Sequence, residues 1–192
     1  MRTTHFELAF AASPAFSGYG IGAYSKNMKK GDGFMFHRTA YSGTREENYA
    51  LVIEQLKSLI SGEPNFIANL ANAAALLNQF FTDINWVGFY LADGEELVLG
   101  PFQGLPACVR IPFGKGVCGT AAAERRTVVV PDVHQFPGHI ACDAASQSEI
   151  VVPLIKDGRV IGVLDIDSPV KNRFDDIDRR FLEQFASVLM SA

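Results

Sequence analysis

Apolar residues recur at helical spacing in three stretches of the chain. The first stretch begins at Thr44, where Thr44 and Glu47 form a capping box, and it ends before Gly62. The second follows Asn65, a favourable N-cap, and the third begins at Asp175. We therefore predict three helices, whose buried stripes are Leu51, Val52, Leu56, Leu59 and Ile60; Phe66, Leu70, Ala74, Leu77 and Phe81; and Ile177, Phe181, Leu182, Phe185, Val188 and Leu189.

Between the second and third helices the pattern changes to short runs of β-branched and aromatic residues, which predict strands. These runs are Trp86–Leu91, Leu97–Phe102, Cys108–Ile111, Val128–Val130, Glu149–Leu154 and Val160–Asp167. Two connections, residues 92–94 and 156–158, are too short for a parallel crossover and favour antiparallel pairing. The predicted fold class is α+β, an antiparallel sheet with helices packed on one face and a long loop over residues 131–148.

Residues 1–43 show no sustained period and contain many Gly, Ser and Ala residues, so we expect a flexible or peripheral N-terminal extension. Residues 44–192 then form one domain, since a chain of 192 residues with 48% hydrophobic side chains suits a single core. A net charge of −4 argues against nucleic acid as a partner. No apolar run approaches the roughly 20 residues needed to cross a bilayer, so no membrane contact is expected.

Two strands carry candidate ligand-binding residues. In the first, alternation places Trp86, Gly88 and Tyr90 on one face. Because Gly88 has no side chain, a methyl group or a cation could lie between the two rings, although ordinary core aromatics have the same pattern.

In the last strand, alternation places Asp165 and Asp167 on one face, roughly 7 Å apart. Glu149, which opens the preceding strand, could join them across the hairpin. Carboxylates shielded from water need a cation, a proton or strong donors, and the ammonium group of an amino acid would serve. A solvated sheet edge and a magnesium or calcium site remain open at this point.

The three cysteines, Cys108, Cys118 and Cys142, contain no C-x-x-C pair, and their odd number favours a reducing compartment, here the cytoplasm. Zinc held by these thiols with His134 or His139 is an alternative, although the spacing is unusual for zinc ligands. A lone cysteine is ordinarily a small buried hydrophobe. Cys142 differs because it lies in a polar, turn-rich loop, where access to a ligand is expected.

Cys118 lies in a glycine-rich turn, residues 114–119, that enters a predicted helix running to Glu124. The free amides of a helix start could hold a substrate carboxylate and lower the pKa of a nearby thiol. A simple tight turn would need the same glycines.

Taken together, these segments resemble the free methionine-(R)-sulfoxide reductases, which are GAF-fold enzymes. The resemblance covers about residues 44–190, includes all three cysteines in order, and rests on residues 85–90, 100–104, 114–119, 131–134, 139–143, 148–153 and 162–168, with Cys108. It implies an oxidoreductase that converts free L-methionine-(R)-sulfoxide to L-methionine.

The resemblance also implies roles for individual residues. Cys142 is expected to attack the sulfoxide and become a sulfenic acid, Cys108 to resolve it as a disulfide reduced by thioredoxin, and Cys118 to act as a secondary recycling thiol. Either Cys108 or Cys118 could be the resolving thiol. One aromatic pair is expected to enclose the sulfoxide end and a set of acids to bind the ammonium group, with at least one acid protonated. These substrate-binding residues are Trp86, Tyr90, Glu149, Asp165, Asp167 and Asp143.

The same resemblance implies that no metal and no organic cofactor are needed, and that a peptide-bound substrate is rejected because it lacks the ammonium group. Two other functions compete with this hypothesis. One is a non-catalytic GAF sensor of a small molecule or of redox state, and the other is a reductase of protein-bound methionine sulfoxide. A homodimer is compatible with a GAF domain, but the sequence does not show one.

Overall fold

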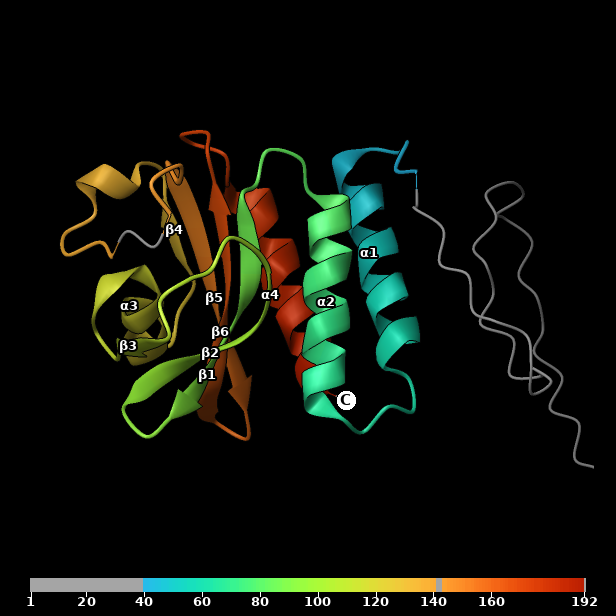
Figure 1. Cartoon of the computed structure of the whole chain (residues 1–192). Coiled ribbons are helices and arrows are strands. Elements are labelled where there is room, and N and C mark those ends of the chain that lie inside the picture. Colours follow the sequence, from blue (N-terminus) through green and yellow to red (C-terminus); the bar gives the residue numbers. More distant parts are fainter. Residues whose placement is uncertain (1–39, 141–142, 192) are drawn as a thin grey trace, which may run out of the picture. The chain divides into compact units, whose positions relative to one another are not determined.

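The computed structural model describes residues 40–140 and 143–191 (Figure 1). The expected extension therefore lies largely outside the described residues. The elements in chain order are α1 (Arg45–Ile60), α2 (Phe66–Phe80), β1 (Trp86–Asp93), β2 (Glu96–Gly104), β3 (Arg110–Pro112), α3 (Gly116–Glu124), β4 (Val128–Val130), the 3-10 helix η1 (Val133–Gln135), β5 (Ser148–Lys156), β6 (Arg159–Ser168) and α4 (Asp176–Met190).

Each long helix begins at the residue that the sequence predicted. Thr44 and Glu47 form the reciprocal capping box of α1. The side chain of Asn65 accepts a hydrogen bond from the Ala68 amide at the start of α2. Asp175 caps α4, where it forms a second capping box with Asp178. These local hydrogen bonds satisfy amides that have no intrahelical acceptor.

The strands form one six-stranded sheet in the order β3-β2-β1-β6-β5-β4, and every neighbouring pair is antiparallel. The β5–β6 hairpin closes through Asp157 and Gly158, both at positive φ (49° and 73°). That backbone matches the two-residue turn that follows the twist of antiparallel strands. The predicted antiparallel α+β class is confirmed.

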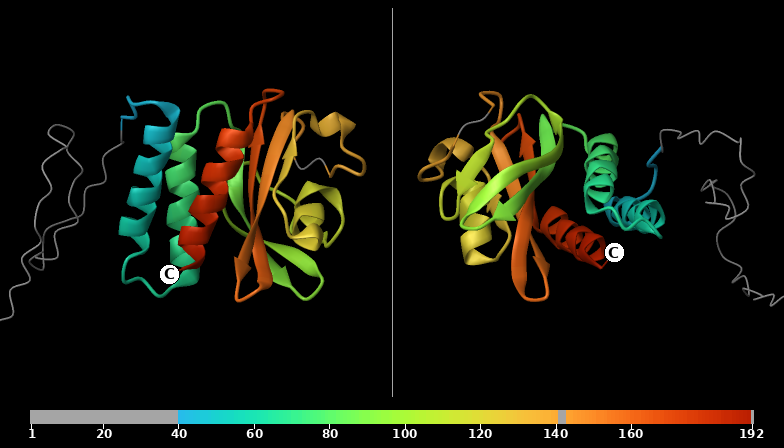
Figure 2. Two further views of the ribbon diagram at one scale, coloured as in Figure 1. Left: turned by 180° about the vertical axis from the view of Figure 1, so that it is seen from behind. Right: turned by 60° about the horizontal axis from the view of Figure 1, so that its bottom comes forward.

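The helices divide unequally between the two faces of the sheet (Figure 2). The long helices α1, α2 and α4 pack on one face, over Phe89, Ile150, Leu164 and other buried residues of the central strands. The short helix α3 packs on the opposite face, so the expectation that the helices share one face holds only for the three long ones. Its apolar residues contact a second core cluster that contains Trp86, Tyr90, Val151 and Val163. This second face carries the candidate site.

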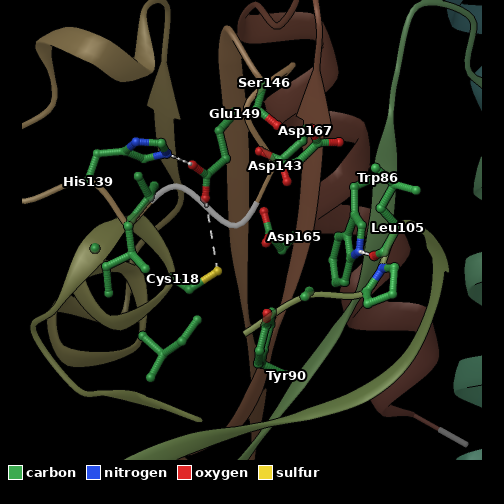
Figure 3. A pocket seen from close by; sticks show the side chains of 16 residues that line it. Trp86, Tyr90, Leu105, Cys118, His139, Asp143, Ser146, Glu149, Asp165 and Asp167 are labelled. Carbon is green, nitrogen blue, oxygen red and sulfur yellow. Dashed lines mark hydrogen bonds and ion pairs between the residues drawn. The ribbon is translucent and has the colours of Figure 1, made fainter. Parts of the chain in front are cut away.

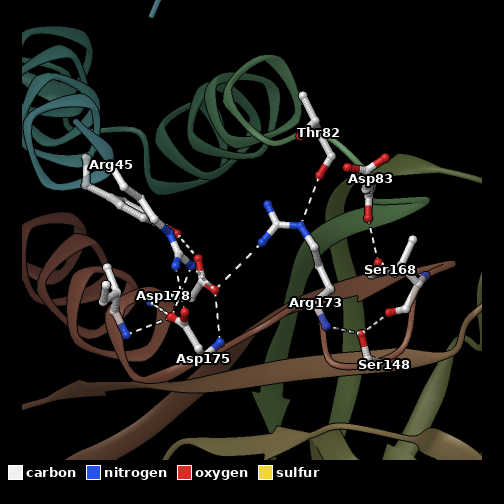
Figure 4. Close-up of polar contacts among 11 residues, drawn as sticks. Arg45, Thr82, Asp83, Ser148, Ser168, Arg173, Asp175 and Asp178 are labelled. Carbon is white, nitrogen blue, oxygen red and sulfur yellow. Dashed lines mark hydrogen bonds and ion pairs between the residues drawn. The ribbon is translucent and has the colours of Figure 1, made fainter. Parts of the chain in front are cut away.

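A buried polar network ties α1 to the start of α4 (Figure 4). Asp178 is fully buried and accepts a hydrogen bond from the hydroxyl of Tyr49. Arg45 forms ion pairs with both Asp178 and Asp175, and its Nη1 lies 2.6 Å from Asp175 Oδ2. Arg173 approaches Asp178 at 3.7 Å. The network compensates the buried charge of Asp178, because a buried carboxylate is tolerated when paired and hydrogen-bonded.

Across residues 40–140 and 143–191, no helix has the length and apolar character required to span a membrane.

Candidate active site

Cross-strand register assembles the acidic part of the site on the α3 side of the sheet. Asp167 on β6 lies directly opposite Glu149 on β5 and opposite Trp86 on β1. Two residues earlier on β6, Asp165 lies opposite Val151 and Gly88. The sequence placed both aspartates on one face, and the central position of β6 then brings Glu149 and Trp86 beside them.

These residues line a pocket of about 540 Å³, including its open mouth, between the sheet and α3 (Figure 3). The residues predicted for substrate binding all line it: Trp86, Tyr90, Asp143, Glu149, Asp165 and Asp167. Cys118 on α3 lines it as well, and neither lysine nor arginine is among the described lining residues. The pocket is therefore acidic and has aromatic walls.

Burial raises the pKa of all three carboxyl groups at the centre of the pocket. For Glu149 and Asp167, desolvation acts first and the charge of Asp165 adds to it. Burial also raises the pKa of Asp165, to about 6, although the neighbouring Cys118 thiol and Glu149 carboxyl group act in the opposite direction. Three negative charges do not coexist here at low cost, so the pocket must hold protons or a cation.

The hydrogen bonding of Asp165 also indicates that the pocket needs a proton or a cationic ligand. It is 6% exposed, yet its Oδ1 atom is buried and has no hydrogen-bond partner in the described part of the chain. A buried oxygen without a donor costs roughly 1–3 kcal/mol, and more when it is charged. A ligand with N–H donors would remove that cost.

Cys118 lies in the first turn of α3 with its Sγ atom 4.0 Å from Glu149 Oε1. The expectation that the helix start lowers the pKa of this thiol is wrong. Burial raises the pKa of Cys118 well above its ordinary value, and the charges of Asp165 and Glu149 raise it further. The effect of the helix dipole is outweighed because the thiolate would be enclosed among carboxylates.

The aromatic wall also differs from the sequence hypothesis in one respect. Trp86 stacks on Phe102 with ring centroids 5.3 Å apart, and a Cβ atom at Gly88 would lie 2.3 Å from the Cβ atom of Phe102 and 2.6 Å from the Trp86 ring. The space above Gly88 is thus filled by Trp86 and Phe102, and no ligand fits there. Trp86 and Tyr90, with centroids 5.9 Å apart, instead form a continuous wall of the pocket.

Both wall residues are fixed by polar contacts with the β2–β3 connection. The Trp86 Nε1 atom donates a hydrogen bond to the carbonyl of Leu105 at 3.1 Å. The hydroxyl of Tyr90 donates to the carbonyl of Cys108 at 3.0 Å. Each aromatic ring is therefore held in one orientation.

Asp143 lies at the rim and is held differently from Glu149, Asp165 and Asp167. It accepts hydrogen bonds from the Ala145 amide at 2.8 Å and from Asn85 Nδ2 at 2.7 Å. These donors lower the pKa of Asp143, so it stays ionised. Asn85 also donates to Ser146 Oγ at 3.0 Å. The sequence pattern did not indicate the positioning contacts of Asn85 and Ser146, although Asn85 directly precedes the aromatic strand.

His139 is a further pocket residue that the sequence offered only as a zinc ligand. Its Nε2 atom lies 3.8 Å from Glu149 Oε2, and its side chain is 14% exposed. Burial lowers the pKa of His139, with the charge of His134 acting in the same direction. His134 itself is exposed on η1 and does not line the pocket.

The predicted redox cysteines differ in what the structure describes. Cys108 is disulfide-bonded, so it is not available as a zinc-binding thiolate here. Cys118 is free and buried. Cys142 lies outside the described residues, but Ile140 and Asp143, described on either side of it, both line the pocket.

Comparison with known proteins identifies the family. The GAF domain model matches residues 65–192. The free methionine-R-sulfoxide reductase of Escherichia coli is 55% identical over 145 residues, covering 76% of this chain and 88% of that protein. The Saccharomyces cerevisiae enzyme of the same name is 48% identical, with 72% and 83% covered. The chain belongs to the free methionine-R-sulfoxide reductase family.

A solved structure of the family agrees. The Neisseria meningitidis free methionine-R-sulfoxide reductase, solved in complex with its substrate, aligns with a TM-score of 0.78 at 49% identity, covering 82% of this chain and 95% of that one. The resemblance that the sequence motifs indicated is therefore confirmed, as are the GAF fold and the classification of the chain as an oxidoreductase.

Proposed function

We propose that this reductase converts free L-methionine-(R)-sulfoxide to L-methionine in the pocket between β6 and α3. The observation that carries the proposal is the buried carboxylate cluster with the unpartnered Asp165 Oδ1 beside an aromatic wall. A free amino acid supplies the ammonium cation that such a cluster needs, and the names of the family relatives supply the substrate class.

The substrate's ammonium group is bound by Glu149, Asp165 and Asp167. The three carboxyl groups line the same pocket and would repel each other as carboxylates if no cation were present. Peptide-bound methionine sulfoxide has an amide in place of this cation, which would leave the acids without a partner. A site built to bind a particular group strongly rejects a substrate that lacks this group.

The substrate's carboxylate is held at the start of α3. Gly116 and Val117, which line the pocket, belong to the first turn of this nine-residue helix. First-turn amides have no intrahelical acceptor and point toward the positive end of the helix dipole. Ammonium and carboxylate are then held by opposite walls, and the side chain extends toward Trp86 and Tyr90.

The thiolate of Cys142 attacks the sulfoxide sulfur, and the oxygen is transferred to the enzyme. Methionine leaves, and Cys142 becomes a sulfenic acid, so the cysteine is oxidised by two electrons and the substrate is reduced by two. A protonated acid of the cluster donates a hydrogen bond to the sulfoxide oxygen during attack. The raised pKa values of Glu149 and Asp167 support that role, since only a neutral carboxyl group can donate.

The Cys108 thiol then attacks the sulfenic acid, forming a disulfide and releasing water. A thioredoxin dithiol reduces this disulfide and becomes oxidised itself. The disulfide-bonded state of Cys108 supports its assignment as the resolving thiol. Cys118 is less suited to recycling, because its buried thiol stays protonated and faces carboxyl groups. Recycling by thioredoxin also places the reaction in a reducing compartment such as the cytoplasm.

The decisive experiment measures thioredoxin-coupled turnover of free L-methionine-(R)-sulfoxide. The wild-type protein should reduce the R-epimer and leave the S-epimer unchanged. Cys142→Ser should abolish turnover, whereas Cys108→Ser should still release about one equivalent of methionine per enzyme and then stop. Full multiple turnover in Cys142→Ser, or equal rates for the two epimers, would show that the assignment is incorrect. A non-catalytic sensor would release no methionine at all.

A further inference from the structure

We propose that the acidic wall of the pocket is also a binding site for a zinc-like divalent cation, held by Cys118, Glu149 and Asp165. One potential ligand atom from each of these buried residues lies within 4.8 Å of the other two. They come from three separate elements, α3, β5 and β6, so the site exists only in the folded domain.

An independent observation points to a cationic ligand at this position. Asp165 is 94% buried, and its Oδ1 atom accepts no hydrogen bond from the described residues. Figure 3 shows Asp165 directed into the pocket between Cys118 and Trp86. An unpartnered buried carboxylate oxygen is a ready metal ligand, because coordination replaces the missing donor.

The donor set selects the class of ion. A thiolate with two carboxylates suits zinc, which accepts sulfur, nitrogen and oxygen in a tetrahedral arrangement. His139 offers a nitrogen on the other side of Glu149, with its Nε2 atom 3.8 Å from Glu149 Oε2. Magnesium and calcium prefer oxygen ligands, so the Cys118 sulfur does not suit them. Cys118 would bind as the thiolate and release its proton to solvent.

Occupation by the ion has a consequence for catalysis, and this part rests on the proposed function. The ion takes two of the three carboxylates that bind the substrate's ammonium group. Zinc and methionine sulfoxide therefore exclude each other, and zinc acts as a reversible competitive inhibitor. Raising the substrate concentration restores the full rate.

Cobalt(II) is a suitable spectroscopic probe of the site, because it binds where zinc does and reports on its ligands. The chain has three cysteines, so the Cys108→Ser/Cys142→Ser protein retains Cys118 as its sole thiol. Adding cobalt to this protein should produce a thiolate-to-cobalt charge-transfer band and tetrahedral ligand-field bands. One equivalent of zinc should remove both sets of bands, and free methionine should weaken cobalt binding.

Three further substitutions, each added to the Cys108→Ser/Cys142→Ser protein, serve as comparisons. Adding Cys118→Ser should abolish the charge-transfer band, and adding Glu149→Gln should weaken cobalt binding at least tenfold. Adding Asp176→Asn, which changes an exposed carboxylate at the start of α4, should leave binding unchanged. Circular dichroism confirms that each variant is folded. A charge-transfer band that persists without Cys118, or cobalt affinity unaffected by Glu149→Gln, would overturn the proposal.

A second measurement uses the wild-type protein. Zinc should raise the apparent KM for methionine sulfoxide without changing kcat, and the inhibition constant should rise at least tenfold in Cys118→Ser. Non-competitive inhibition, or an unchanged constant in that variant, would contradict the shared site. Turnover without zinc tests the reductase activity alone, and the cobalt spectra need no turnover, so the two proposals fail independently.

Discussion

The hydroxyl of Tyr90 on β1 donates a hydrogen bond to the backbone carbonyl of Cys108 at 3.0 Å. The contact joins the aromatic wall of the pocket to the connection that carries the proposed resolving cysteine. Burial, together with the negative charge of Asp165, raises the pKa of Tyr90, so the hydroxyl remains a donor throughout the physiological range. A substrate-wall residue thus also positions the segment that acts in the next step.

Tyr90→Phe should therefore slow formation of the Cys108 disulfide more than it slows reduction of the sulfoxide. Removing the hydroxyl frees the Cys108 carbonyl but keeps the ring that lines the pocket. We expect the first equivalent of methionine to be released at close to the wild-type rate, while formation of the Cys108 disulfide slows about 5- to 30-fold, as one buried hydrogen bond of about 1–2 kcal/mol predicts. Rapid-quench methionine release and thiol titration separate the two steps. Equal slowing of both steps would assign Tyr90 to substrate positioning only.

Glu149→Gln should weaken substrate binding. The change preserves shape but replaces a carboxyl oxygen that faces the ammonium group with an N–H donor, and a hydrogen bond to a charged group contributes about 1.5–3 kcal/mol. The KM for methionine sulfoxide should therefore rise about 10- to 100-fold. Asp132→Asn, a carboxylate outside this pocket, is the matched control and should leave KM unchanged. An unaltered KM in Glu149→Gln would remove this residue from the ammonium site.

N-acetylation of the substrate should nearly abolish turnover. N-acetyl-methionine-(R)-sulfoxide keeps the reactive sulfoxide and the carboxylate but lacks the cation that Asp165 and its neighbours require. Sites built to bind a polar group reject analogues that lack it by several orders of magnitude, so kcat/KM should fall by about 10⁴-fold. A competition assay with both compounds in one reaction measures the ratio directly. Comparable rates would instead favour a reductase of protein-bound methionine sulfoxide.

Arg45→Met should destabilise the domain in a pH-dependent way. Arg45 bonds both Asp175 and the fully buried Asp178, so its loss should cost about 1–3 kcal/mol at pH 7, less than a fully buried pair because Arg45 is partly exposed. The hydrogen bond from Arg45 lowers the pKa of Asp175 in the folded state. The stabilisation linked to Asp175 is therefore present above its unfolded pKa and is lost as the pH falls through the lower folded value.

Urea unfolding at pH 7 and pH 3 tests this prediction. The difference between wild type and Arg45→Met should shrink at the lower pH. Lys57→Met is the control, because its ion pair with Glu54 is exposed on one helix and should change stability by less than about 0.5 kcal/mol. A difference that grows on acidification would contradict the role given to Asp175.

The fold was predictable where short-range interactions decide it. Thr44, Asn65 and Asp175 start their helices through hydrogen bonds to amides two or three residues away. The hairpin at Asp157 and Gly158 is equally local. Alternation along β1 and β6 correctly separated the faces of those strands, because successive strand residues point to opposite sides.

The candidate site was predictable only in part. The presence of acidic and aromatic residues on one face of their strands indicated that Asp165, Asp167 and the aromatic pair bind a ligand. The pattern did not show that β6 lies between β1 and β5, which places Trp86 and Glu149 on either side of Asp167. Nor did it show His139 beside Glu149, since those residues belong to a loop and a strand that meet only in the folded chain.

By itself, the sequence determined the helix starts, the antiparallel hairpins, the faces of the strands and the family. The tertiary structure alone decided that α3 covers the acidic face, that Trp86 and Phe102 fill the space above Gly88, and that the Cys118 thiol is less acidic than an exposed one. The physical reason is range: caps, turns and alternation depend on neighbours along the chain, whereas burial and the charges around a group depend on segments brought together by folding.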